Sequence, residues 1–247
     1  MPTVMPPIGP ALTPEQELAC AFRILAGSGF AENLAGHITW SLDGDTEMFV
    51  NPWGLWWSEL RASDICRVDA DARVTGGRWD VTPAIHIHTE LHRSRGDARV
   101  IVHNHPYWCT VLAALGLLPE VFHQTACLYD GEMVLVDEYD GEIDDAGKGA
   151  ALADRIGGAT IALLVNHGVL ITGATVPEAV YRAVSFDRQC RLTYDVLMAR
   201  AAGVGAARVI DPSARAGMQL SLLERATEAY WAGAVRGLLH RESDVLL

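Results

Sequence analysis

The sequence RVIVHNHP, residues 99–106, places two histidines at the end of a short apolar run. Three consecutive β-branched residues favour a buried strand, because branched side chains pack well on a pleated surface. Pro106 cannot donate a hydrogen bond to a sheet, so the strand is expected to end before it. Residues two apart in extended backbone point to the same side, so His103 and His105 are predicted to approach one ion together.

A second apolar run, Ile161 to Val165, ends in Asn166-His167-Gly168. Gly168 lets the backbone pass close to whatever His167 binds. Ligands of α/β folds lie where strands give way to loops. Three neutral imidazoles with one or two open positions are typical of a catalytic metal site, which zinc, iron(II), manganese or cobalt can occupy. The alternative interpretation is a pair of histidines whose nitrogens are satisfied by hydrogen bonds at a strand end.

Helices and strands alternate around these two runs. Thr13-Pro14-Glu15-Gln16 predicts a helix start with Thr13 as N-cap and Gln16 completing a capping box. Such alternation predicts one α/β domain with helices on both sides of a sheet. The other expected elements are a hairpin over 37–42 and 48–51 around Asp43-Gly44-Asp45, short strands over 65–68 and 73–74, and helices over 85–94, 107–115, 177–200 and 214–240.

The chain has 247 residues, with no interior linker or repeat. By itself this length fits one large domain or two small ones, and a domain of the full length buries enough surface to be stable without disulfides or a structural metal. Residues 1–12 contain four prolines and are predicted to form a flexible arm. Residues 13–247 are predicted to form the single domain, with 201–247 as a C-terminal helical extension.

The formal net charge of −12 and the isoelectric point near 5.1 restrict the partners of the chain. A negative field repels phosphate backbones and anionic lipids, so neither nucleic acid nor a membrane surface is an expected partner. Five widely spaced cysteines without a CxxC pair suit reduced thiols in a cytosol. The first ten residues lack the basic and apolar regions of a signal peptide, and no run of 18 apolar residues occurs. The prediction is a cytoplasmic protein that acts on a small molecule.

The histidine segments resemble those of the class II aldolase/adducin family, and the likeness extends from about Pro14 to Arg200. The resemblance implies a three-layer α/β/α sandwich with a central mixed sheet, and a homotetramer with active sites at subunit interfaces. It also implies one divalent ion, zinc first and manganese, iron or cobalt as alternatives, held by His103, His105 and His167. The matching segments are residues 97–105, Asn166-His167-Gly168, Gly36-His37-Ile38-Thr39, Asn51-Pro52-Trp53-Gly54 and residues 88–97.

One departure from the family pattern concerns proton transfer. The aldolases of the family carry an acidic residue shortly before the metal pair, and that position falls at or near Ala84 here. His86 or Glu90 can approach the ion from the next turn, so both are predicted as catalytic substitutes. The alternatives are a surface or interface role for His86 and a solvated helix face for Glu90. His88 matches a position that the family fills with histidine, which favours packing behind the metal ligands.

A second departure concerns the loop that binds phosphate in the family, which here reads Asn51-Pro52-Trp53-Gly54-Leu55-Trp56-Trp57. Phosphate needs many N–H and O–H donors, whereas indole faces suit planar apolar groups. The loop therefore predicts a non-phosphorylated, aromatic substrate. The predicted substrate contacts are Trp53, Trp56, His37 and Tyr129. The alternatives are tryptophans packed in the core or at a subunit contact, and a scaffold role for His37.

These features predict a metal-dependent carbon–carbon lyase, either a decarboxylase or an aldolase, acting on an aromatic hydroxy acid or hydroxy-carbonyl compound. Decarboxylation is slightly favoured, because it needs no base to begin bond breaking and therefore tolerates the missing carboxylate. Two alternatives stay open at this point. One is an iron(II) oxygenase on the same scaffold, and the other is a non-catalytic, adducin-like interaction module.

Overall fold

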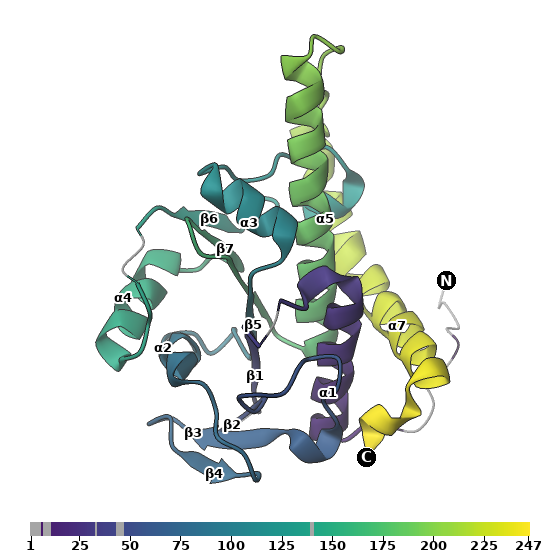
Figure 1. Ribbon diagram of the computed structural model, residues 1–247. Helices are drawn as coiled ribbons and strands as arrows, with labels where there is room; N and C mark the ends of the chain where they lie inside the picture. Colours follow the sequence, from purple (N-terminus) through teal and green to yellow (C-terminus); the bar gives the residue numbers. More distant parts are fainter. Residues whose placement is uncertain (1–5, 7–10, 33, 43–46, 139–140) are drawn as a thin grey trace.

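The computed structural model describes residues 6, 11–32, 34–42, 47–138 and 141–247, and within them eight strands form one sheet (Figure 1). The strand order is β4-β3-β2-β1-β5-β8-β7-β6, and all neighbours are antiparallel except the parallel pair β6 and β7. The predicted mixed sheet is therefore confirmed. The strands are β1 His37–Ser41, β2 Glu47–Val50, β3 Cys66–Asp69, β4 Val74–Gly76, β5 Val100–Asn104, β6 Met133–Val136, β7 Ile161–Leu164 and β8 Val169–Gly173.

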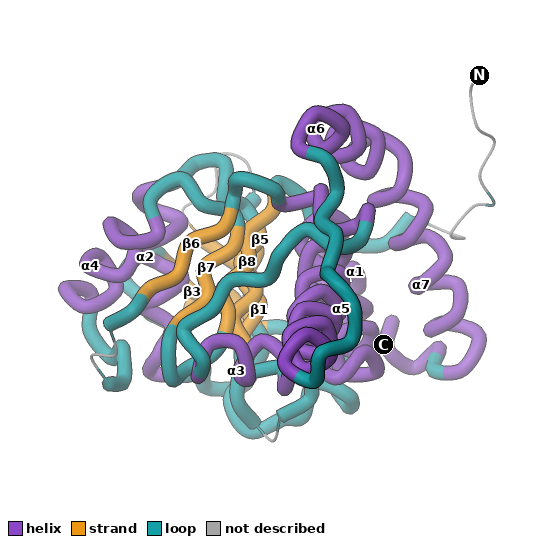
Figure 2. Tube along the Cα trace, turned by 90° about the horizontal axis from the view of Figure 1, so that it is seen from above, coloured by secondary structure: helices purple, strands orange, loops and turns teal. Residues whose placement is uncertain are grey.

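Helices cover both faces of the sheet, which confirms the predicted three layers (Figures 1 and 2). Helices α2 (His86–Ser94) and α4 (Ala146–Ile156) pack on one face. Helices α1 (Pro14–Leu25), α3 (Tyr107–Ala114) and α5 (Val176–Ala201) pack on the other. None of the helices in the described part of the chain has the length and apolar character needed to span a bilayer.

The C-terminal region is helical and shares the main core. Helices α6 (Pro212–Ser221) and α7 (Thr227–Arg241) are joined by a π-helical turn. Trp231 and Val235 of α7 are buried in the same cluster as α1 and α5. The end of the chain is tied back to α1, because the Arg23 guanidinium donates to Asp244 at 2.9 Å. Residues 1–12, the predicted arm, fall mostly outside the described residues.

Several elements form where the sequence predicts them. The Thr13 hydroxyl accepts from the Gln16 amide, and the Gln16 side chain accepts from the Thr13 amide, so the capping box is confirmed. Strands β1 and β2 pair as the predicted hairpin, although its turn at residues 43–46 lies outside the described residues. Two strands and one α-helix have no counterpart in the prediction, namely β6, β8 and α4.

Strand β5 is at the centre of the sheet and alternates between the two cores. Val100 and Val102 lie in the core beneath α1 and α5, while Ile101 lies in the core beneath α2 and α4. Because side chains along a strand alternate with a period of two, His103 faces the same side as Ile101. The end of β5 therefore directs its histidine towards α2.

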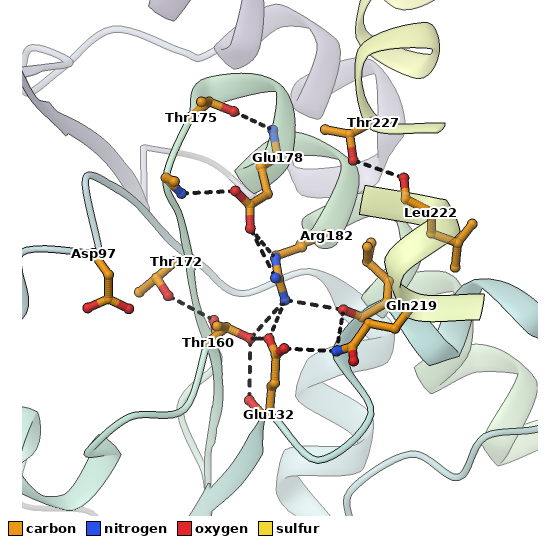
Figure 3. Close-up of polar contacts among 12 residues, drawn as sticks. Asp97, Glu132, Thr160, Thr172, Thr175, Glu178, Arg182, Gln219, Leu222 and Thr227 are labelled. Atoms are coloured by element: carbon orange, nitrogen blue, oxygen red, sulfur yellow. Dashed lines mark hydrogen bonds and ion pairs between the residues drawn. The ribbon is translucent and has the colours of Figure 1, made fainter. Parts of the chain in front are cut away.

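A buried arginine joins the parallel edge of the sheet to the helices (Figure 3). Arg182 of α5 donates to Glu132 at 2.8 Å and to the Thr160 hydroxyl at 2.9 Å. Glu178, one turn earlier on α5, accepts from the same guanidinium at 3.0 Å. Gln219 of α6 donates to the second carboxylate oxygen of Glu132 at 2.8 Å. Glu132 and Thr160 precede β6 and β7, so the network ties the start of both strands to α5 and α6.

Candidate metal centre

Three histidines from two separate strand ends converge at one point. Strands β5 and β8 are antiparallel, with Asn104 opposite Val169, so the turn before β8 lies beside the end of β5. The ring centroids of His103 and His167 are 4.8 Å apart, those of His105 and His167 5.0 Å, and those of His103 and His105 5.2 Å. One ligand atom from each ring lies within 4.8 Å of the others. The three rings therefore meet as the sequence predicts.

Backbone conformation brings the second strand end this close. Asn166 adopts a left-handed conformation with φ of 58°, which asparagine tolerates better than most residues. A Cβ on Gly168 would lie 2.5 Å from Cδ2 of His105 and 2.6 Å from the carbonyl oxygen of Asn104. Gly168 is therefore required by the close approach of the two chains, as its position after His167 suggests.

Each ring of the HxH pair has one nitrogen fixed from behind. Nδ1 of His103 donates to the Val169 carbonyl at 3.1 Å, and Nδ1 of His105 lies 2.7 Å from a carboxylate oxygen of Glu32. Such partners fix the tautomer and present Nε2 as the free electron pair. Nε2 of His105 is buried and has no hydrogen-bond partner. These contacts orient the pair for a ligand at Nε2.

Burial and neighbouring rings keep His103 and His167 neutral. Burial, followed by repulsion from His167 and His105, holds the pKa of His103 well below its usual value. Burial and then His105 lower the pKa of His167 to about 4. Metal ions bind neutral imidazole, so His103 and His167 can bind a cation at neutral pH without losing protons. Three converging imidazoles, one of them with an unpartnered buried Nε2, fit a divalent ion of the zinc type.

Neither predicted proton-transfer residue joins this group. Both carboxylate oxygens of Glu90 accept from Arg93, at 2.6 and 2.7 Å, and its Cγ faces Gly149 on α4. The backbone of His86 also packs on Gly149. Among the residues that the structure describes, no aspartate or glutamate belongs to the three-histidine cluster. Catalytic roles for His86 and Glu90 stay predictions.

The tryptophan loop divides into an exposed and a buried part. Trp53 and Trp56 are 51% and 46% exposed. Trp57 is buried, packs edge-on against Phe22 at 5.0 Å, and donates from its indole to the Gly36 carbonyl at 3.3 Å. The core interpretation is therefore correct for Trp57. The other two indoles are free to contact a substrate, and the loop is anchored to the residue that precedes His37.

The structure corrects the prediction for Tyr129. Its side chain is fully buried, its ring packs against Phe186 at 5.3 Å, and its hydroxyl donates to the Ser185 carbonyl at 3.3 Å. Both the ring and the hydroxyl of Tyr129 therefore contact residues of α5. Tyr129 is a core residue rather than a substrate contact, because the 3₁₀ turn Gln124–Tyr129 directs it inward.

A second group of histidines lies beside the triad. The ring of His37 is 5.8 Å from that of His103, directly opposite it in the β1–β5 ladder. His88 and His92 of α2 both contact the Thr39 hydroxyl. Burial, followed by His105 and His167, lowers the pKa of His37 to about 3. Glu32, Thr39 and His92 were missed by the sequence analysis, since no spacing rule links them to the HxH pair.

Replacing Gly168 by alanine is expected to weaken divalent-metal binding about 10–100-fold, the effect typical of disturbing a group that orients a ligand. The added Cβ would displace the His105 ring or the Asn104 carbonyl. Titration of zinc against a competing chelator measures the change. Gly158→Ala is the matched control, because its Cβ would meet nothing within 4 Å. Equal zinc affinity in the two variants would contradict this account of the turn.

The chain matches a family model, and its fold matches solved structures of that family. The model, described as the class II aldolase and adducin N-terminal domain, covers residues 16–194. The chain therefore belongs to the class II aldolase and adducin family. The structure of L-fuculose 1-phosphate aldolase from Glaciozyma antarctica PI12 superposes with a TM-score of 0.80 over 96% of both chains, at 24% identity, and so supports the fold alone.

The chain is also similar in sequence to proteins with quite different names. An adducin-related protein of Schizosaccharomyces pombe is 32% identical over 69% of the chain, and the match spans 55% of that protein. The 4-hydroxy-3-prenylphenylpyruvate oxygenase/4-hydroxy-3-prenylbenzoate synthase of Streptomyces roseochromogenus subsp. oscitans is 31% identical over 75% of the chain and 67% of its own length. The decarboxylase NovR of Streptomyces niveus is 30% identical over 75% of the chain and 69% of its own length.

Proposed function

We propose that the protein is a divalent-metal-dependent carbon–carbon lyase that decarboxylates a non-phosphorylated aromatic hydroxy acid, with aldol cleavage of a hydroxy-carbonyl compound as the second lyase reaction. The observation that carries the proposal is the convergence of three histidines whose ligand atoms lie within 4.8 Å of one another. A non-catalytic module has no need of this arrangement.

His103, His105 and His167 would hold the ion, zinc first and manganese, iron or cobalt as alternatives. Bound there, a divalent ion supplies a Lewis acid that stabilises negative charge on a substrate oxygen. The Val169 carbonyl and Glu32 hold the rings of the HxH pair in the tautomer that such binding needs. The chain thus contributes a preorganised set of donors.

Two observations support an aromatic substrate. The exposed indoles of Trp53 and Trp56 stand on a loop whose Asn51 and Trp57 side chains both contact the Gly36 carbonyl, next to His37. Indole faces bind planar apolar groups. The name of one relative, a 4-hydroxy-3-prenylbenzoate synthase, agrees with a ring-bearing acid, and the name of another, a decarboxylase, agrees with loss of CO2. We therefore assign Trp53, Trp56 and His37 to substrate binding.

Decarboxylation suits the residues around the triad better than aldol cleavage. When the bond to the carboxyl carbon breaks, CO2 leaves and the electron pair stays on the substrate, spread towards its oxygen. The carbon then accepts one proton. No base is needed at the start, which agrees with the converging ligand atoms, since within the described ranges they come from three histidines and no carboxylate, and Glu32 lies behind His105 at Nδ1. Aldol cleavage must first remove a hydroxyl proton.

The proposal is tested by metal analysis followed by a substrate screen. The purified protein is expected to contain or take up about one divalent ion per chain, consistent with three ligands and an open position. Hydroxybenzoates are then screened for CO2 release, and α-hydroxy ketones for aldehyde release. Failure to bind any divalent ion would refute the proposal and support an adducin-like interaction module.

An iron(II) oxygenase is the second candidate, and the oxygenase in the name of one relative favours it. A three-histidine site with an open position leaves room for dioxygen. Oxygen consumption by the iron(II)-loaded protein with an aromatic substrate, without CO2 release under anaerobic conditions, would replace the lyase by this activity.

Replacing Trp53 by serine is expected to raise the KM for an aromatic substrate about tenfold, because one ring contact is worth roughly 1 kcal/mol or more. Metal content should not change, since the group that could hold the ion consists of His103, His105 and His167 and does not include Trp53. Steady-state kinetics measure the effect. The matched variant Trp53→Tyr keeps an aromatic face and should stay near the wild type. Equal KM values for Trp53→Ser and the wild type would remove Trp53 from the site.

The proposal includes a homotetramer with active sites at subunit interfaces, as the resemblance to the family implies. A cleft of about 680 Å³ opens on the surface between α3, α5 and α7, lined in part by Tyr107, Trp108 and Tyr230. Tyr107 is exposed and the other two rings are partly buried, and aromatic side chains on a surface are enriched at protein interfaces. Sedimentation velocity would report a monomer if this part of the proposal is wrong.

A cytoplasmic location also belongs to the proposal. All five cysteines are buried and free of disulfides. Reduced thiols are typical of the cytosol. Fractionation of cells that produce the full-length protein tests this assignment, and recovery from a secreted or membrane fraction would contradict it.

A further inference from the structure

Four polar side chains fill the space between β1 and α2, next to the triad. His37 and Thr39 stand on β1 opposite His103 and Ile101, so both point towards α2. His88 of α2 lies above them, with its ring 5.5 Å from that of His37 and 6.5 Å from that of His103. The cluster therefore continues the metal centre into the interior rather than forming a separate site.

The Thr39 hydroxyl connects the two helix histidines. It lies 2.8 Å from Nδ1 of His88 and 2.8 Å from Nε2 of His92. A hydroxyl has one hydrogen, so it donates to one ring and accepts from the other. Two directions of this chain are possible in principle, and they leave opposite tautomers at His88.

The backbone of Ala98 favours one of these directions. Burial lowers the pKa of His92 to about 4, and the backbone of Ala98 acts in the opposite sense by favouring a protonated ring. A backbone group with this effect is a carbonyl, so it favours a hydrogen on Nδ1 of His92, the nitrogen that does not face Thr39. Nε2 of His92 then accepts from Thr39, and Thr39 accepts from Nδ1–H of His88. The neutral His88 ring is left with a bare electron pair on Nε2.

Two nitrogens of the cluster are unpartnered. Nε2 of His88 and Nδ1 of His37 are buried and have no hydrogen-bond partner, the same condition as Nε2 of His105 in the triad. A buried polar atom without a partner costs about 1–3 kcal/mol, so structures rarely retain one without a use. We assign Nε2 of His105 to metal binding, and this suggests that Nε2 of His88 and Nδ1 of His37 also bind a ligand.

We propose that His88, with His37 beside it, binds one O–H group next to the three-histidine centre, and that His88 acts only as a hydrogen-bond acceptor there. The group is a hydroxyl of the substrate or a bound water, and a carboxylate or phosphate oxygen is excluded because it has no hydrogen to donate. Thr39 and His92 are positioning residues that fix the His88 tautomer. If the O–H group belongs to the substrate, the inference rests on the proposed function. The tautomer of His88 and its need for an O–H partner do not depend on that function.

Nitrogen NMR of the zinc-loaded full chain tests the tautomer without any substrate. Long-range ¹H–¹⁵N spectra of the histidine rings should show His88 protonated at Nδ1, with Nε2 unprotonated and shifted upfield by a hydrogen bond. Thr39→Val should release the fixed tautomer and give a mixture, whereas Thr39→Ser, which keeps the hydroxyl, should not. A hydrogen on Nε2 of His88, or an Nε2 resonance typical of a free electron pair, would overturn the proposal.

Binding of simple probes identifies the source of the O–H group. The three monohydroxybenzoates and benzoate are titrated into the zinc-loaded protein by calorimetry. A substrate hydroxyl predicts that one hydroxybenzoate binds about tenfold more tightly than benzoate, and that His88→Asn abolishes this ratio while the zinc content stays normal. The asparagine amide keeps a group near the Nδ1 position and removes the acceptor at Nε2. Equal affinities, together with a hydrogen-bonded Nε2 in the spectra, assign the position to water.

These experiments separate the inference from the proposed lyase activity. A protein that shows the predicted tautomer and probe selectivity but releases no CO2 would refute the lyase and keep the acceptor site. An active lyase with hydrogen on Nε2 of His88 would refute the acceptor site and keep the lyase.

Discussion

Replacing His105 by alanine is expected to reduce the bound divalent metal to background. His105 supplies a buried, unpartnered Nε2 to the cluster, and the remaining pair, His103 and His167, offers only two nitrogens. Two imidazoles fall short of the three protein ligands that catalytic zinc sites normally have. Metal analysis after dialysis against zinc measures the loss, and any lyase activity should disappear with it. The fold should persist, because the hydrophobic cores do not include His105.

Two further variants make the result specific. Glu32→Gln leaves all three ligands and weakens only the contact behind His105, so its zinc affinity should fall by a smaller factor, about 10–100-fold. His240→Ala removes an exposed histidine from α7 and should retain the wild-type zinc content. Normal zinc content in His105→Ala would show that the ligand assignment is wrong, and equal losses in Glu32→Gln and His105→Ala would indicate a general structural defect.

The three histidines could be singled out from the sequence because each follows an apolar run that predicts a strand ending beside it. The β-branched run before His103 fixes a strand, and the period of two then places His105 on the same side. Nothing in the local pattern says that the turn holding His167 lies beside the end of β5. That proximity comes from the antiparallel pairing of β5 with β8, a strand that the sequence analysis missed.

Helix α4 shows why other elements escaped prediction. Its sequence, AGKGAALADRI, contains two glycines, which lower intrinsic helix propensity by about 1 kcal/mol each. The structure explains why residue 149 is glycine, since a Cβ there would lie 2.5 Å from the His86 carbonyl oxygen of α2. Close helix packing thus overrides local propensity. A single sequence does not reveal such a contact between elements about sixty residues apart.

The polar partners of the site were the least predictable part. Glu32 follows a π-helical turn. Thr39 lies on a strand, and in the sequence it indicates only a β-branched residue that favours a strand. Their roles depend on which atoms face them across the β1–β5 ladder and from α2. The prediction for Tyr129 was wrong for the same reason, because its position in the sequence says nothing about the direction of its ring.

Arg182→Ala is expected to lower the free energy of unfolding by about 3 kcal/mol or more, because removing one partner of a buried ion pair leaves the others uncompensated. The guanidinium is buried and its loss would strand Glu132 and Glu178, whose side chains are 31% and 20% exposed. Partial exposure favours the lower end of the range. For a chain of this size the midpoint of thermal unfolding should fall by roughly 6–12 °C.

A double-mutant cycle separates the network from a general loss of packing. Glu132→Gln removes the charge that Arg182 neutralises, so the double variant should be clearly less destabilised than the sum of the two single variants. Lys148→Ala breaks an exposed pair with Asp144 and should cost only about 0.2–1 kcal/mol. Additive effects of Arg182→Ala and Glu132→Gln would contradict the coupling. Because Thr160 precedes β7 and His167 follows it, a weakened network should also reduce zinc affinity, and this links the stability of the sheet edge to the geometry of the metal centre.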